Sequence, residues 1–142
     1  GFPGETEEDY LETKKAVEYL QFDQAYVFRY SQRKDTPAAE MEGQLPERIK
    51  EERNQDLLAL VDEIVERKNH AHVGQTHEVL CEGPSRYNKE RLSGRTRTNR
   101  IVIFDGDADR MSGHLFDVKI DECSGHTLYG DPVLQSVESV GV

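Results

Sequence analysis

The sequence predicts an α+β chain in which a helical first half precedes a small antiparallel β-barrel. Two patterns in the 142 residues support this division. Up to about residue 68, apolar residues recur at helical spacing. After residue 70, short alternating segments are separated by turns rich in Gly, Pro, Asp and Ser, which is typical of a small barrel or sandwich.

The first half predicts two helices with one strand between them. Thr6 is a suitable N-cap, and Asp9 takes the place of the capping-box acid, so we expect a helix over Glu7–Leu20. Residues 25–30 are rich in β-formers and predict a strand. A longer amphipathic helix is expected over residues 46–68. The order of turn, helix and strand is typical of the end of a β/α repeat.

The second half predicts strands at residues 73–82, 95–104, 113–122 and 127–133. The pattern changes from helical to alternating near residues 69–72. We therefore expect three parts: residues 1–70 with the linking helix, a β-barrel at 71–133, and a weakly ordered tail at 134–142.

Charge is distributed unevenly along the chain. The formal net charge of −10 argues against non-specific nucleic-acid binding by the whole chain. Between residues 86 and 100 the sign of the net charge reverses, because this segment contains six arginine or lysine residues and one acidic residue, Glu90. A local basic patch on an acidic protein is a candidate site for RNA.

The basic segment predicts specific RNA contacts. If residues 95–104 form one strand, then Arg95, Arg97 and Asn99 point to one face. Arginine can form bidentate hydrogen bonds with phosphate, and Tyr87 could stack on an unpaired base. The alternative is a solvated turn with ordinary surface charges. The predicted RNA-binding residues are Arg86, Lys89, Arg91, Arg95, Arg97, Asn99 and Arg100.

Other patterns predict no self-sufficient active site and no metal site. The segment 105–109 (DGDAD) resembles the start of a calcium loop, but Arg110 and Phe116 stand where such a loop needs Gly and Glu. The histidines at 70, 72 and 77 lack ligand-spaced partners. Cys81 and Cys123 are expected to be free thiols in a reducing cytoplasm. The sequence shows no signal peptide and no membrane span.

Several motifs together resemble the radical S-adenosylmethionine methylthiotransferases. Residues 1–10 (GFPGETEEDY), 25–31 (AYVFRYS) and 36–39 (TPAA) resemble the last barrel segments of that family. Residues 73–80 (VGQTHEVL) and 92–104 (LSGRTRTNRIVIF) resemble its C-terminal TRAM domain. Within the family, the likeness is greatest to bacterial enzymes that act on N6-isopentenyladenosine in tRNA. Together with the missing initiator Met, this predicts a C-terminal fragment.

The resemblance implies a fold, cofactors and a partner. The fold would be the C-terminal β/α remnant of a radical-SAM barrel followed by the TRAM barrel. The intact enzyme would add a 2-methylthio group beside the tRNA anticodon, using S-adenosylmethionine and two 4Fe-4S clusters. Gly1, Gly4 and Glu5 match the loop on its S-adenosylmethionine side. Residues 31–36 (SQRKDT) depart from the family's usual Ser-Pro-Arg-Pro-Gly-Thr.

The fragment itself is expected to bind tRNA at the anticodon region, without catalysis and without a bound cofactor. The cluster-binding cysteine motifs of the family do not occur in it. We expect no DNA or membrane partner, and a cytoplasmic location. Two alternatives stay open: a sibling methylthiotransferase acting on a ribosomal protein or on threonylcarbamoyl-adenosine tRNA, or a non-enzymatic module whose basic turn binds an acidic protein.

Overall fold

In the computed structural model, residues 1–133 are described and the chain divides into two compact units. The first unit is Gly1–Val65 and the second begins at Glu66, so the division falls within helix α3 (Glu47–His70). The expected tail, residues 134–142, lies outside the described residues. The predicted boundary between residues 70 and 71 stays a prediction.

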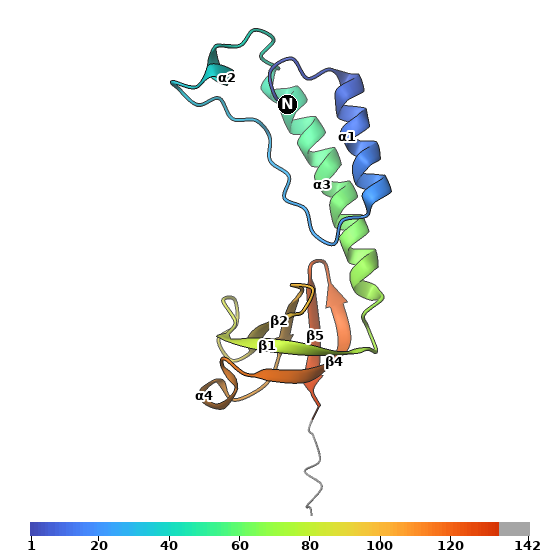
Figure 1. The fold of residues 1–142 in the computed structure, drawn as a ribbon, viewed down its shortest axis with the longest axis vertical. Helices are drawn as coiled ribbons and strands as arrows, with labels where there is room; N and C mark the ends of the chain where they lie inside the picture. The colour runs from blue at the N-terminus through green and yellow to red at the C-terminus, as the bar shows by residue number, and fades with distance from the viewer. Residues whose placement is uncertain (134–142) are drawn as a thin grey trace, which may run out of the picture. The chain divides into compact units, whose positions relative to one another are not determined.

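The first unit is built around helices α1 (Glu7–Leu20) and α3, which run alongside each other (Figure 1). Both predicted helices are confirmed, and α3 extends to His70, two residues beyond the expected end. The capping box is also confirmed. The Asp9 N–H donates to the Thr6 hydroxyl at 3.1 Å, and the Thr6 N–H donates to the Asp9 carboxylate at 2.9 Å.

The two long helices share an apolar cluster and a polar contact. Val17 of α1 packs with buried valine and isoleucine side chains of α3. Nearby, the Tyr10 hydroxyl donates to the Asp56 carboxylate, and Lys14 Nζ lies 2.7 Å from Asp56 Oδ2. Hydrogen bonds from Lys14 and Tyr10 lower the pKa of Asp56, so this carboxylate stays charged beside its partners. The contact fixes the register of α1 on α3.

The predicted strand at residues 25–30 is wrong. These residues carry no regular secondary structure, and the short helix α2 (Pro37–Glu40) follows them. A strand forms only where its backbone pairs with a neighbouring strand, and residues 1–65 contain none. Ala25 and Val27 pack against the helical cluster instead, so the β-forming side chains are used for packing.

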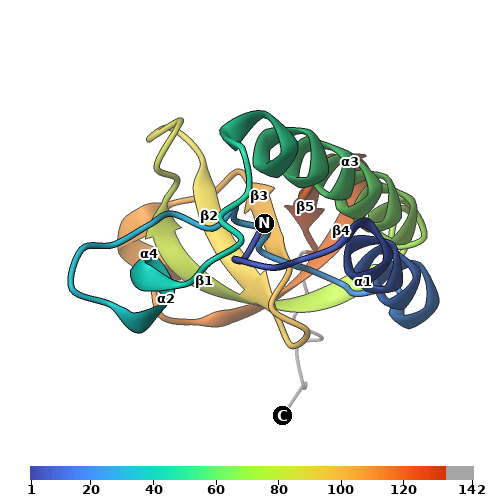
Figure 2. The ribbon, with the colours of Figure 1, turned by 90° about the horizontal axis from the view of Figure 1, so that it is seen from above.

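The second unit is a closed five-stranded barrel. Its strands are β1 (Thr76–Pro84), β2 (Leu92–Thr96), β3 (Ile101–Phe104), β4 (Leu115–Ser124) and β5 (Thr127–Pro132). They follow the order β1-β2-β3-β5-β4 around the ring, which is seen from above in Figure 2. The predicted small barrel is thus confirmed.

The expectation of a purely antiparallel barrel is wrong for one strand pair. Strands β3 and β5 pair in parallel, with Ile101 opposite Thr127 and Ile103 opposite Tyr129. All other neighbours are antiparallel. A closed ring with an odd number of strands cannot alternate in direction throughout, so five strands require at least one parallel pair.

The segment predicted as one strand, residues 95–104, is a hairpin made of β2 and β3. The Asn99 N–H donates to the Thr96 carbonyl at 2.9 Å, and the Thr96 N–H donates to the Arg100 carbonyl at 3.0 Å. Asn99 has φ of 64°, a left-handed conformation that asparagine tolerates better than most residues. The chain therefore reverses direction within the basic segment.

The barrel interior is apolar and closely packed. Side chains at alternate strand positions point inward, and Val79, Val102, Phe104, Val118, Ile120 and Leu128 are fully buried. Cys81 and Cys123 are buried free cysteines, and burial raises the pKa of the Cys123 thiol. The connection at residues 105–114 contains a short helix, α4 (Ala108–Met111), where only a polar turn was expected.

Gly130 allows β4 and β5 to approach closely. A Cβ atom there would clash with the Lys119 carbonyl oxygen and lie 2.8 Å from its carbonyl carbon, and backbone atoms cannot rotate away. We expect Gly130→Ala to lower the free energy of unfolding by about 2 kcal/mol, measured by urea denaturation. The control Asp131→Ala, at an exposed neighbouring position, should change it by less than about 0.5 kcal/mol. Equal stability of both variants would contradict this packing.

No helix within residues 1–133 combines the length and the apolar character needed to cross a membrane.

Candidate nucleic-acid interface

Three neighbouring strands place six side chains in a regular grid on the outside of the barrel. In one row Ser93 lies opposite Ile103, which lies opposite Tyr129. In the next row Arg95 lies opposite Ile101, which lies opposite Thr127. All six side chains are partly exposed, because their strand neighbours fill the core. We call these six residues the β2–β3–β5 face.

The loop between β1 and β2 turns the edge of this face into a groove. The Ser85 N–H donates to the Arg91 carbonyl at 2.8 Å, which closes the base of the loop. The groove has a volume of about 640 Å³. Besides the β2–β3–β5 face, its lining residues are Glu82, Pro84, Ser85, Arg86, Tyr87, Asn88 and Arg91. Tyr87 is fully exposed, so its ring is available to a ligand.

Arginine and tyrosine side chains give the groove its chemical character. The Arg91 guanidinium lies over the Tyr129 ring, 5.8 Å from its centroid, and Arg91 Nε donates to Asp105 at 2.7 Å. Arg95 donates to Asn99 Oδ1 at 3.1 Å. Arginine guanidinium groups can bind phosphates in a bidentate manner, and the neighbouring aromatic and aliphatic side chains can pack against the faces of bases. This combination suits a single-stranded nucleic acid.

A β-bulge in β1 places one carboxylate, that of Glu82, among the arginines of the groove. The register of β1 against β2 shifts between Cys81 and Gly83, so Glu82 is the extra residue of the bulge. Its Oε2 lies 3.5 Å from Arg95 Nε. The Glu82 side chain is half exposed and lines the groove.

The structure brings together some of the predicted RNA-binding residues and separates others. Arg86, Arg91 and Arg95 line the groove, and Lys89 lies in the same loop without lining it. The predicted single face of Arg95, Arg97 and Asn99 is wrong, because the hairpin turn interrupts the strand.

The turn residues have partners of their own. Arg97 forms a 2.7 Å ion pair with Glu78, and its side chain is 81% exposed. Arg100 Nε donates to Asn69 Oδ1 at 3.1 Å, while its Nη1 donates to the Thr98 hydroxyl at 2.7 Å. The Asn99 side-chain oxygen accepts from Arg95. Arg100 thus helps hold the barrel to the end of α3, whereas Arg97 is mostly exposed and does not line the groove.

Sequence reasoning missed Ile101, Ile103, Thr127, Tyr129 and Glu82 as members of this surface. The contribution of β5 depends on a parallel pairing between strands far apart in sequence, which no local pattern indicates. Glu82 had a weak signal, because Gly83-Pro84 directly follows it and glycine often marks a bulge.

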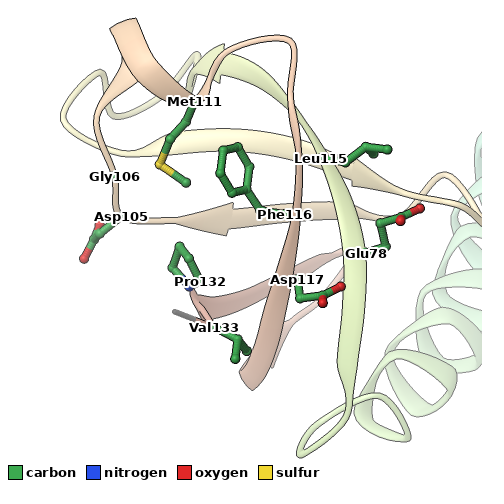
Figure 3. A pocket seen from close by; sticks show the side chains of 9 residues that line it. All are labelled: Glu78, Asp105, Gly106, Met111, Leu115, Phe116, Asp117, Pro132 and Val133. Atoms are coloured by element: carbon green, nitrogen blue, oxygen red, sulfur yellow. The ribbon is translucent and has the colours of Figure 1, made fainter. Parts of the chain in front are cut away.

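A second pocket on the barrel has the opposite charge. It has a volume of about 720 Å³ and is lined by the residues labelled in Figure 3: Glu78, Asp105, Gly106, Met111, Leu115, Phe116, Asp117, Pro132 and Val133. Three carboxylates and no cation line it, and Arg97 and Arg91 pair with Glu78 and Asp105 without lining the pocket, so the pocket offers phosphate no cationic partner. The nucleic-acid candidate is therefore the groove on the β2–β3–β5 face.

Gly1, Gly4 and Glu5, expected from the resemblance to bind S-adenosylmethionine, lie together in the turn before α1. The Gly4 N–H donates to the Gly43 carbonyl at 2.9 Å. Glu5 Oε1 lies 2.7 Å from Arg53. Burial raises the pKa of Glu5, but the Gly1 amino group and Arg53 outweigh it and the net shift is downward. The Glu5 carboxylate is thus already engaged, and the cofactor role stays a prediction.

The described residues do not fit an iron–sulfur cluster. Such clusters need several thiolates, whereas Cys81 and Cys123 are both buried in the barrel core. Residues 1–133 bring together no group of three or more His, Cys, Asp or Glu side chains suited to a metal. His72 Nδ1 and His77 Nε2 lie 3.0 Å apart, but no third ligand joins them there.

Comparison with known proteins confirms the resemblance seen in the sequence. The family model described as TRAM domain matches residues 70–133. A tRNA-2-methylthio-N(6)-dimethylallyladenosine synthase of Akkermansia muciniphila is 58% identical over 132 residues, covering 93% of this chain and 29% of the synthase. A synthase of the same name from Fusobacterium nucleatum is 47% identical over 133 residues, covering 94% and 30%.

The chain therefore spans about 30% of the length of these curated relatives. The five-stranded barrel agrees with the matched domain, because its strands all lie within residues 70–133. Residues 70–133 match the TRAM domain, and over most of its length the chain is similar to these synthases.

Proposed function

We propose that this chain is the tRNA-gripping part of an enzyme that adds a 2-methylthio group to N6-dimethylallyladenosine, also called isopentenyladenosine, beside the anticodon. The groove on the β2–β3–β5 face carries the proposal, because it combines three arginines with two tyrosines on an otherwise acidic chain. The names of the relatives supply the substrate class. A tRNA substrate implies a cytoplasmic location.

In this proposal the first unit is the remnant of a radical-SAM barrel. The motifs at residues 1–10 and 25–39 support this assignment. Other parts of the enzyme would supply the cluster-binding cysteines, and S-adenosylmethionine would be bound next to the turn at residues 1–5. The chain alone would then hold tRNA without modifying it. The relatives do not favour the sibling substrates, and no structural observation favours an acidic protein partner.

Binding of tRNA at several salt concentrations tests the proposal. Displacement of counterions by Arg86, Arg91 and Arg95 predicts that log K falls against log salt with a slope of about −2 to −3. Filter binding of the full chain to unmodified tRNA measures this slope. A neutral polymer of similar size serves as the competitor and should not displace tRNA. Affinity that is independent of salt, or equal displacement by the neutral polymer, would contradict the proposal.

A further inference from the structure

We propose that the groove on the β2–β3–β5 face binds one unpaired nucleotide of RNA and selects guanine through the Glu82 carboxylate. The inference rests on the proposed function, because it names the nucleotide that the same groove recognises. Three features carry it: the aromatic and aliphatic surfaces, the surrounding arginines, and one carboxylate placed by a bulge.

The surfaces of the groove suit the flat faces of a base. Ile101 and Ile103 lie side by side with Thr127 and Tyr129 and form an apolar floor. Tyr87 lines the same groove and is fully exposed, so its ring has no packing role in the barrel. An aromatic ring gains about 1–3 kcal/mol by stacking on a base. A solvent-exposed tyrosine that lines the same groove as an apolar floor therefore offers a base a ring on which to stack.

The nucleotide has to be unpaired. In an RNA duplex the base faces are covered by their neighbours, and the Watson–Crick edges are already bonded. The loop at residues 85–91 closes the groove on one side. A base can therefore enter the groove only after that base has left the stack of neighbouring bases. Arg86, Arg91 and Arg95 surround the groove and can bind the flanking phosphates.

Glu82 supplies the preference among bases. Among the residues that line this groove, all of them within the described part of the chain, Glu82 is the one carboxylate. An ionised carboxylate only accepts hydrogen bonds. Guanine presents two adjacent donors, N1–H and the N2 amino group, to such a pair of oxygens. On the Watson–Crick edge of adenine, cytosine or uracil, the hydrogen-bond donor lies next to an acceptor atom. The lone pair of that acceptor would be repelled by the second oxygen of the carboxylate.

The orientation of Glu82 is held by the protein. Arg95 Nε lies 3.5 Å from Glu82 Oε2, and Arg95 is in turn bonded to Asn99. The bulge between Cys81 and Gly83 keeps Glu82 outside the barrel core. The backbone register therefore places Glu82 at the groove before RNA arrives.

Fluorescence anisotropy with short oligouridines tests the inference on the full chain. The oligomers carry one central guanosine, adenosine or inosine, or uridine throughout. We expect guanosine to bind roughly tenfold more tightly than adenosine. Inosine keeps N1–H and lacks the N2 amino group, so its affinity should fall between the two. Glu82→Gln should abolish the guanosine preference, and Glu90→Gln should retain it.

The Glu90→Gln variant is a matched control, because Glu90 is exposed in the same loop and does not line the groove. Both variants remove one negative charge. Equal affinity for guanosine and adenosine oligomers, or a preference that survives Glu82→Gln, would overturn the inference and leave RNA binding intact. Absence of binding to every oligomer and to tRNA would overturn the proposed function as well.

Discussion

Replacing Arg91 and Arg95 together with glutamate should weaken tRNA binding by on the order of a hundredfold. Each arginine lines the groove and is partly exposed, and each hydrogen bond to a phosphate contributes about 1.5–3 kcal/mol. Reversal also places two carboxylates against the RNA backbone. Filter binding at several salt concentrations should show a shallower salt dependence, with a slope reduced by about 2.

A matched double reversal separates the groove from the overall charge. Arg48→Glu with Arg110→Glu produces the same change in net charge at side chains that are 76% and 86% exposed. Neither residue lines the groove. This variant should bind tRNA within about threefold of the original chain, because exposed charges outside a binding site act only through screened, long-range attraction. Equal weakening by both double variants would contradict the assignment of the groove.

Replacing Phe104 with alanine should lower the free energy of unfolding of the barrel by about 4 kcal/mol. Phe104 is fully buried and is the largest such side chain in residues 1–133. The lost burial and the remaining cavity both contribute, and the surrounding strands can only partly close the space. Since small domains are stable by only about 5–15 kcal/mol, much of the barrel should be unfolded at moderate urea concentrations.

Urea denaturation followed by circular dichroism measures this loss. Phe104→Leu serves as the control, because leucine keeps most of the volume and should cost less than half as much as alanine. A loss below about 1 kcal/mol for Phe104→Ala would show that the position is not central to the core.

Local sequence signals were sufficient for the two long helices, α1 and α3, but not for the short helices α2 and α4. Thr6 and Asp9 define the start of α1 through hydrogen bonds between residues three apart, so neighbouring residues contain all the information. The strand expected at residues 25–30 failed for the opposite reason. Its β-forming side chains are a local property, whereas a strand needs a partner that residues 1–65 do not contain.

The barrel shows the same limit at a larger scale. The alternation of apolar residues identified the segments that form strands, and Val102 and Phe104 do lie in the core. It could not reveal that the chain turns at residues 97–100, because Thr, Arg and Asn fit a strand by alternation alone. The residue type at position 99 was the available signal, because asparagine favours turns and tolerates the left-handed conformation that Asn99 adopts. Counting five strands would also have predicted the parallel pair.

The candidate site was predicted in its charged half and missed in its apolar half. Clustering of cations along the sequence revealed Arg86, Arg91 and Arg95, since all three lie on one short stretch of chain. Tyr129 reaches them only through the register of β5 against β3. Registers between distant strands are set by the whole core, so no single segment encodes them.

The parallel pairing of β3 with β5 has a consequence for folding. The groove is lined by residues of both β3 and β5, so it is absent from any partly folded barrel in which these two strands are not paired. RNA bound in the groove would then interact with the closed state alone. By mass action it would stabilise the barrel by an amount that grows with the ratio of RNA concentration to Kd, and recognition and folding would be thermodynamically coupled.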